Sequence, residues 1–89
     1  MELKNESNFF RFTFVGGTEF FIKSDKFQKT SGILDKLSDG VMKNDFFALK
    51  QTNTQRERNP VHFRRTALLS VEKVDGKMIG NNNKLWEML

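Results

Sequence analysis

The sequence predicts a single small α+β domain, in which an antiparallel sheet packs on one helix in the order strand, strand, helix, strand, strand. Three patterns support this prediction: alternating apolar residues on both sides of a Gly-Gly pair, a stretch with helical spacing, and a second alternating stretch after residue 60. The chain has 89 residues and no cysteine, so it offers one modest core without disulfides. We assign residues 1–76 to this domain and residues 77–89 to a flexible linker and an apolar C-terminal tail.

The first two strands are predicted to form a hairpin. Phenylalanine alternates with polar residues over 9–15, and a similar alternation returns over 18–24. Gly16 and Gly17 between them can adopt the positive φ angles of a two-residue turn. Ten of the eleven aromatic residues are phenylalanine, which buries a large area without a polar group. We expect the core to include Phe10, Phe12, Phe14, Phe20 and Phe47.

One helix is predicted after the hairpin. The Ser-Asp pair at 24–25 can cap its first turn, and apolar side chains then recur at helical spacing over 27–41. Gly40 lies where a C-terminal glycine cap is expected. Residues 30–32 are poor helix formers, so the helix either breaks there or begins only at Ser31.

The remaining strands are predicted on either side of a polar loop. Residues 46–52 form the third strand, and Pro60 suits the entry to the next strand better than its centre. Alternation over 61–74 fails at Arg65 and Leu68. This failure predicts a bulge or a short turn that splits the last strand.

The most basic segment is residues 56–65, which holds four of the five arginines, the only histidine and the only proline. Four arginines less one glutamate give it +3 of the chain's net charge of +4. Guanidinium groups bind phosphate oxygens bidentately, and each neutralised phosphate releases counterions. We therefore expect a small binding module for nucleic acid or another polyanion, with a site made by Arg56, Arg58, His62, Arg64 and Arg65.

Two other interpretations of this segment stay open. Charges on a loop and on an outward strand face are often merely solvated, and Glu72 shares a strand face with Arg64 and would neutralise it. A small nuclease or toxin would need a carboxylate such as Glu57, or an arginine, beside His62. The chain carries no nucleotide-binding loop, nucleophile motif or paired-histidine metal signature. We accordingly expect a non-enzymatic protein without cofactor or metal.

Apolar residues outside the expected core support an alternative function, a protein-interaction or regulatory module that acts as an oligomer. Three phenylalanines lie at strand positions whose side chains point to the face opposite the core: Phe9, Phe21 and Phe46. They pack against another layer or subunit, or they provide stacking platforms for unpaired bases. The C-terminal tail docks into its own domain, a partner subunit or another protein. Its interaction residues are Leu85, Trp86, Met88 and Leu89.

The location and origin of the protein are inferred from composition. No apolar run approaches the roughly 20 residues that cross a bilayer, and the N-terminus lacks the features of a signal peptide. We therefore expect a cytoplasmic protein without a membrane partner. The preference for Phe, Lys and Asn is typical of an AT-rich genome. The order of elements is similar to that of small phage and bacterial accessory domains, a likeness that transfers no functional residue.

Overall fold

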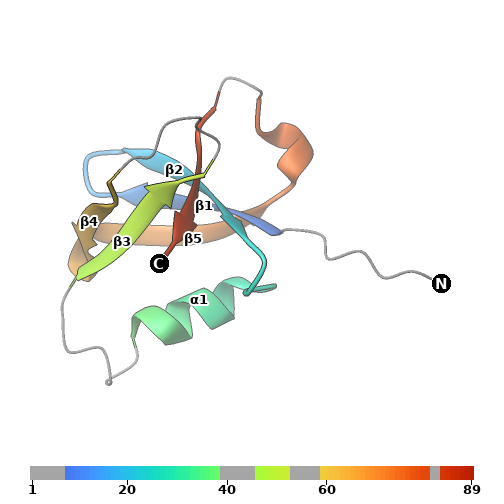
Figure 1. The fold of residues 1–89 in the computed structure, drawn as a ribbon. Helices are drawn as coiled ribbons and strands as arrows, with labels where there is room; N and C mark the ends of the chain where they lie inside the picture. Colours follow the sequence, from blue (N-terminus) through green and yellow to red (C-terminus); the bar gives the residue numbers. More distant parts are fainter. Residues whose placement is uncertain (1–7, 39–45, 53–58, 81–82) are drawn as a thin grey trace.

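The computed structural model describes residues 8–38, 46–52, 59–80 and 83–89, and these form one helix and a six-stranded sheet (Figure 1). The prediction of a small α+β fold is confirmed. The elements in chain order are β1 (Asn8–Phe14), β2 (Glu19–Ser24), α1 (Thr30–Leu37), β3 (Phe46–Gln51), β4 (Val61–Arg64), the 3-10 turn η1 (Arg65–Ala67), β5 (Leu68–Val74), the 3-10 turn η2 (Gly76–Met78) and β6 (Leu85–Met88).

The sheet is strongly curled. Its order is β4-β3-β6-β2-β1-β5, so β4 and β5 are opposite edges although only η1 connects them. In a flat sheet these edges would lie about 24 Å apart, at about 4.8 Å per strand. The connection through η1 spans at most about 14 Å, at about 3.5 Å per residue. The rings of Phe14 in β1 and Phe63 in β4 stack with centroids 4.5 Å apart, although four strand spacings separate these strands in the sheet. The sheet therefore wraps around its own core.

The hairpin and the split of the last strand follow the sequence prediction, although the turn spans residues 15–18 and not Gly16 and Gly17 alone. β1 and β2 pair antiparallel, and the turn places Gly16 at φ 94° and Gly17 at φ 90°, values that L side chains rarely adopt. The break expected near Arg65 is η1, which ends β4 and starts β5. The alternation of apolar and polar residues predicted the hairpin and the break, because both are determined by residues close together in the sequence.

The helix begins within one residue of the later of its two predicted starts, Ser31. α1 begins at Thr30, and its N-cap Lys29 makes no side-chain cap. The cap predicted at residues 24–25 is wrong, because the Ser24 hydroxyl accepts instead from the backbone N–H groups of Lys26 and Phe27, in a turn that precedes the helix. At the other end Ser38 is the C-cap, and Gly40 lies outside the described residues.

Two features of the predicted sheet need correction. The sheet is mixed, because β2 and β6 run parallel. The segment predicted as a C-terminal tail is β6, which lies in the middle of the sheet between β2 and β3. Without β6, the backbone groups along the facing edges of β2 and β3 would lack partners, and buried backbone groups are nearly always paired.

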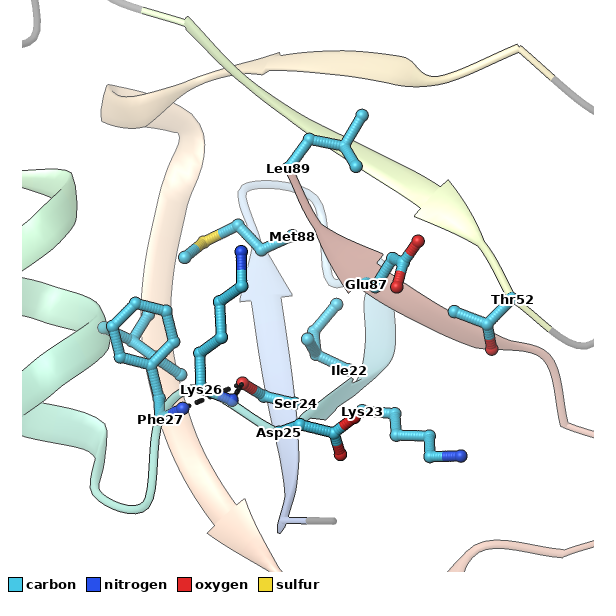
Figure 2. A pocket seen from close by; sticks show the side chains of 11 residues that line it. Ile22, Lys23, Ser24, Asp25, Lys26, Phe27, Thr52, Glu87, Met88 and Leu89 are labelled. Atoms are coloured by element: carbon cyan, nitrogen blue, oxygen red, sulfur yellow. Dashed lines mark hydrogen bonds between the residues drawn. The ribbon is translucent and has the colours of Figure 1, made fainter.

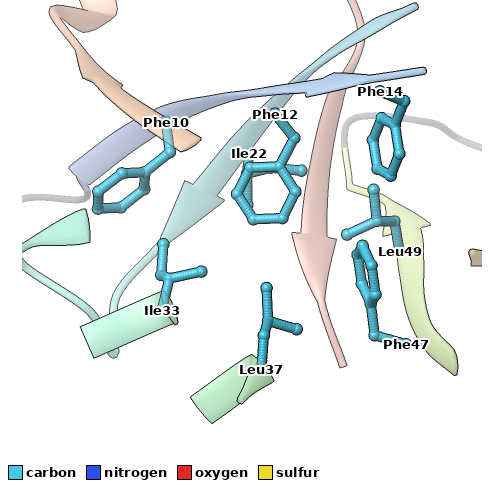
Figure 3. Packing of buried hydrophobic residues seen from close by; sticks show 8 residues of the cluster. All are labelled: Phe10, Phe12, Phe14, Ile22, Ile33, Leu37, Phe47 and Leu49. Atoms are coloured by element: carbon cyan, nitrogen blue, oxygen red, sulfur yellow. The ribbon is translucent and has the colours of Figure 1, made fainter. Parts of the chain in front are cut away.

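The core lies between the concave face of the sheet and α1. Figure 3 shows Ile33 and Leu37 of α1 pointing toward the phenylalanine rings of the strands. Four of the five predicted core phenylalanines are buried, and Phe20 packs against them half-buried. The buried residues are Phe10, Phe12, Phe14, Ile22, Ile33, Leu37, Phe47 and Leu49. No helix among the described residues is long and apolar enough to cross a membrane.

Candidate nucleic-acid interface

The predicted polyanion site falls partly within the described residues. Arg56 and Arg58 lie outside them. His62 and Arg64 are exposed on β4 at one edge of the sheet, and Arg65 is the first residue of η1. The sequence therefore predicted the outward direction of His62 and Arg64 correctly, whereas their binding role stays a prediction.

Arg64 lies against an exposed aromatic ring. The β3–β4 register places Phe46 opposite Arg64 and Ala48 opposite His62, so all four side chains share the outer face of the hairpin. The Arg64 guanidinium carbon is 5.5 Å from the centroid of the Phe46 ring, and Phe46 is 45% exposed. A cation over an exposed ring is stabilised by about 0.5–1 kcal/mol. This contact gives both side chains a defined position without covering the ring.

Arg65 points in the opposite direction from Arg64. Its Nη1 group donates a hydrogen bond to the carbonyl oxygen of Leu37, the last residue of α1. Helix C-termini carry unpaired carbonyl groups and a partial negative charge, which a guanidinium group satisfies. Arg65 thus connects the sheet corner to the helix, although the sequence prediction grouped it with the arginines of the binding site.

The glutamate expected to neutralise Arg64 has another partner. Glu72 Oε2 accepts from Arg11 Nη2 at 2.6 Å, and Glu19 Oε2 lies 3.9 Å from Arg11 Nε. The pKa of Arg11 is raised above its ordinary value, first by this hydrogen bond and then by the attraction of Glu72. Arg64, by contrast, makes no ion pair within the described part of the chain.

His62 has no recognisable catalytic surroundings among the residues that the structure describes. It is exposed, and no group of three histidine, aspartate or glutamate side chains in residues 8–38, 46–52, 59–80 and 83–89 could hold a metal ion. Glu57, the carboxylate nearest in sequence, lies outside those ranges. The nuclease hypothesis therefore gains no support and stays a prediction.

The apolar C-terminal residues are packed within the domain. Leu85, Trp86 and Met88 are half-buried in β6, and the Trp86 ring meets Phe20 edge-on with centroids 5.0 Å apart. Leu89 is 54% exposed, although its N–H donates to the Ala48 carbonyl at 3.0 Å. Of the four predicted interaction residues, Leu89 is thus the one left largely accessible.

Sequence reasoning missed a cleft between β2 and β6. Its volume is about 310 Å³, and its lining comes from β2, the turn after β2, α1, the end of β3 and the end of β6 (Figure 2). No local pattern indicates it, because these segments are far apart in the sequence and meet only through the parallel pairing of β2 with β6.

Comparisons of the chain with protein-family models, with curated proteins and with solved structures found no match. The function must therefore be argued from the geometry and chemistry of the chain itself.

Proposed function

We propose that the protein binds single-stranded nucleic acid through the outer face of the β3–β4 hairpin. We call this surface the hairpin face, formed by Phe46, Lys50, His62 and Arg64. The observation that carries the proposal is the exposed Phe46 ring, with the Arg64 guanidinium 5.5 Å from its centroid on a strand at the edge of the sheet. An accessible ring beside an accessible cation is the combination that unpaired bases and their phosphates require.

Each residue of the hairpin face has a separate role in this proposal. An unpaired base stacks on Phe46, an interaction of about 1–3 kcal/mol per base. Arg64 donates to a phosphate oxygen, and no carboxylate among the described residues competes for it within ion-pair distance. His62 precedes Arg64 by two residues on the same face of β4, and Lys50 lies further along β3, where Glu87 of β6 is its cross-strand neighbour.

The connection between β3 and β4 has a net charge of +1 in the sequence, since Glu57 stands between its two arginines. In the sequence it carries Arg56 and Arg58, and it joins the two strands that form the hairpin face. Duplex DNA or RNA keeps its bases stacked on one another, so it could use the cations but not the Phe46 ring. The proposal therefore predicts preference for single strands over duplexes.

Fluorescence anisotropy with short labelled oligonucleotides tests the proposal. We expect binding of single-stranded DNA or RNA at 50 mM salt that weakens at 200 mM. Phe46→Ala should weaken single-strand binding about tenfold, because it removes the stacking platform. Arg64→Ala should weaken binding and lower the slope of log K against log salt by about 0.7.

Two variants on α1 provide matched controls for this experiment. Leu34→Ala removes an apolar side chain that is 46% exposed, close to the 45% of Phe46, and Lys29→Ala removes an exposed cation at the N-cap of the helix. Both should bind like the unmodified chain. The proposal fails if no oligonucleotide binds at low salt, or if Phe46→Ala and Arg64→Ala bind as well as these controls.

A further inference from the structure

A cleft that the proposed function does not use opens where β2 and β6 separate. The two strands pair at only two positions, Phe21 with Leu85 and Ile22 with Trp86. After these two positions β2 remains paired only with β1, and β6 remains paired only with β3. The carboxyl ends of β2 and β6 therefore diverge. The space between them is about 310 Å³, near the lower end of the roughly 300–1,000 Å³ typical of small-molecule sites.

The base of this β2–β6 cleft is apolar. Ile22 and Ile33 lie at its bottom, each 1% exposed, and half-buried Phe27 and Met88 stand beside them. Figure 2 shows Ile22 near the middle of the group, with Met88 above it. The apolar surface that a ligand can reach comes from Phe27 and Met88, and its burial would favour an apolar body at the base of the cleft.

Lys26 provides the charge above the apolar base. Its side chain extends across the cleft toward Met88 in Figure 2, and it has no ion-pair partner among the described residues. The turn that carries it is held by the Ser24 hydroxyl, which accepts from the Lys26 N–H at 3.2 Å and the Phe27 N–H at 3.0 Å. The ammonium group is therefore presented from a fixed backbone position.

The acidic residues around the cleft do not cancel this charge. Glu87 is the cross-strand neighbour of Lys50, and Asp25 already makes an interaction within the chain. Lys23 also lines the cleft. The cleft lining thus holds two cations, Lys23 and Lys26, and two carboxylates, Asp25 and Glu87, and no ion pair joins Lys26 to either carboxylate.

We propose that the β2–β6 cleft binds a small organic acid, a single carboxylate attached to an apolar body. The apolar body lies against the half-buried Phe27 and Met88, and the carboxylate accepts a charge-assisted hydrogen bond from the Lys26 ammonium group. A neutral analogue makes the same apolar contacts but loses that bond, and an amine brings a like charge against Lys26.

Titrations of the ¹⁵N-labelled full chain, followed by amide chemical shifts, test this proposal. The probes are isocaproate, its neutral amide isocaproamide and the amine isohexylamine. We expect isocaproate to give saturable shifts at the amides of Lys26, Phe27 and Met88. Isocaproamide should bind about tenfold more weakly, since it lacks the charged partner, and isohexylamine should bind more weakly still.

Variants at exposed lysines identify the charge that is responsible. Lys26→Gln should weaken isocaproate binding about tenfold, whereas Lys26→Arg should retain it. Lys29→Gln is the matched control, because Lys29 is exposed and does not line the cleft. The proposal is overturned if isocaproate gives no saturable shift, if isocaproamide binds equally well, or if Lys29→Gln loses as much affinity as Lys26→Gln.

Discussion

The curl of the sheet can be tested by replacing the two rings that meet across it. Phe14 in β1 is 4% exposed and stacks on half-buried Phe63 in β4 at 4.5 Å. The perturbation is a double-mutant cycle with Phe14→Leu, Phe63→Leu and the chain that carries both. Leucine keeps an apolar side chain at each site, and the cycle separates the Phe14–Phe63 contact from the contacts that each ring makes with Phe20 and Phe47.

The expected coupling follows from the distance between the rings. Aromatic pairs with centroids 4.5–7 Å apart stabilise proteins by about 0.5–1.5 kcal/mol beyond the area they bury. In a flat sheet, four strand spacings of about 4.8 Å would hold β1 and β4 about 19 Å apart, and the two substitutions would then be additive. Each single substitution should itself cost about 1–3 kcal/mol of the free energy of unfolding.

Urea unfolding followed by the fluorescence of Trp86, the only tryptophan, measures all four free energies. A cycle between Phe10 and Phe63 is the control, because both pack on the core but no contact between their rings is observed. We expect coupling of about 0.5–1.5 kcal/mol for the first pair and additivity within about 0.5 kcal/mol for the control pair. Additivity of Phe14 with Phe63 would refute the inference that the sheet brings β1 and β4 together.

Three further predictions concern other contacts. Arg65→Ala should lower the free energy of unfolding by about 1–3 kcal/mol, because it removes the hydrogen bond to the end of α1. The same substitution at the neighbouring Arg64 should cost less than about 1 kcal/mol. Equal losses for the two variants in urea unfolding would contradict this difference. A chain ending at Gly80 lacks β6, so its circular dichroism and amide spectra should be those of an unfolded protein, and a dispersed spectrum would show that β6 is dispensable. Gly76→Ala should destabilise the fold by about 1–3 kcal/mol, because the added Cβ would lie 2.6 Å from Phe9 Cε2. Gly80→Ala should be tolerated, because the atom nearest to its Cβ would be 3.6 Å away. Similar melting temperatures for the two variants would count against this reasoning.

The parts of the fold that were predicted from sequence depend on local patterns. The first hairpin follows from alternation and two glycines, and the split of the last strand follows from a break in parity at Arg65. β6 was not predicted, because four residues are too few to display a period. Its partners, Ile22 in one neighbouring strand and Leu49 in the other, are distant in the sequence. Only tertiary pairing identifies such a strand.

The candidate site shows the same difference between what local sequence patterns predict and what depends on tertiary pairing. Parity placed Phe46 and Arg64 on outward faces, but the register that sets them opposite each other depends on the path of the chain between β3 and β4. Parity also placed Glu72 on the face of Arg64, whereas η1 redirects the chain so that β5 pairs with β1 and Glu72 reaches Arg11. The sequence therefore indicated the accessibility of Phe46 and Arg64, but it did not indicate their neighbours, nor that Arg65 is half-buried against α1.

The central position of β6 has a consequence for folding. β6 is the last of the described strands in the chain, yet it separates β2 from β3 in the sheet. Before residues 85–88 have been synthesised and docked, β2 and β3 each expose a row of unpaired backbone groups. Such edges pair readily with strands of other chains. A nascent chain of this protein therefore cannot complete its sheet during synthesis of the first five strands, and intermolecular association competes with its folding until the sixth arrives.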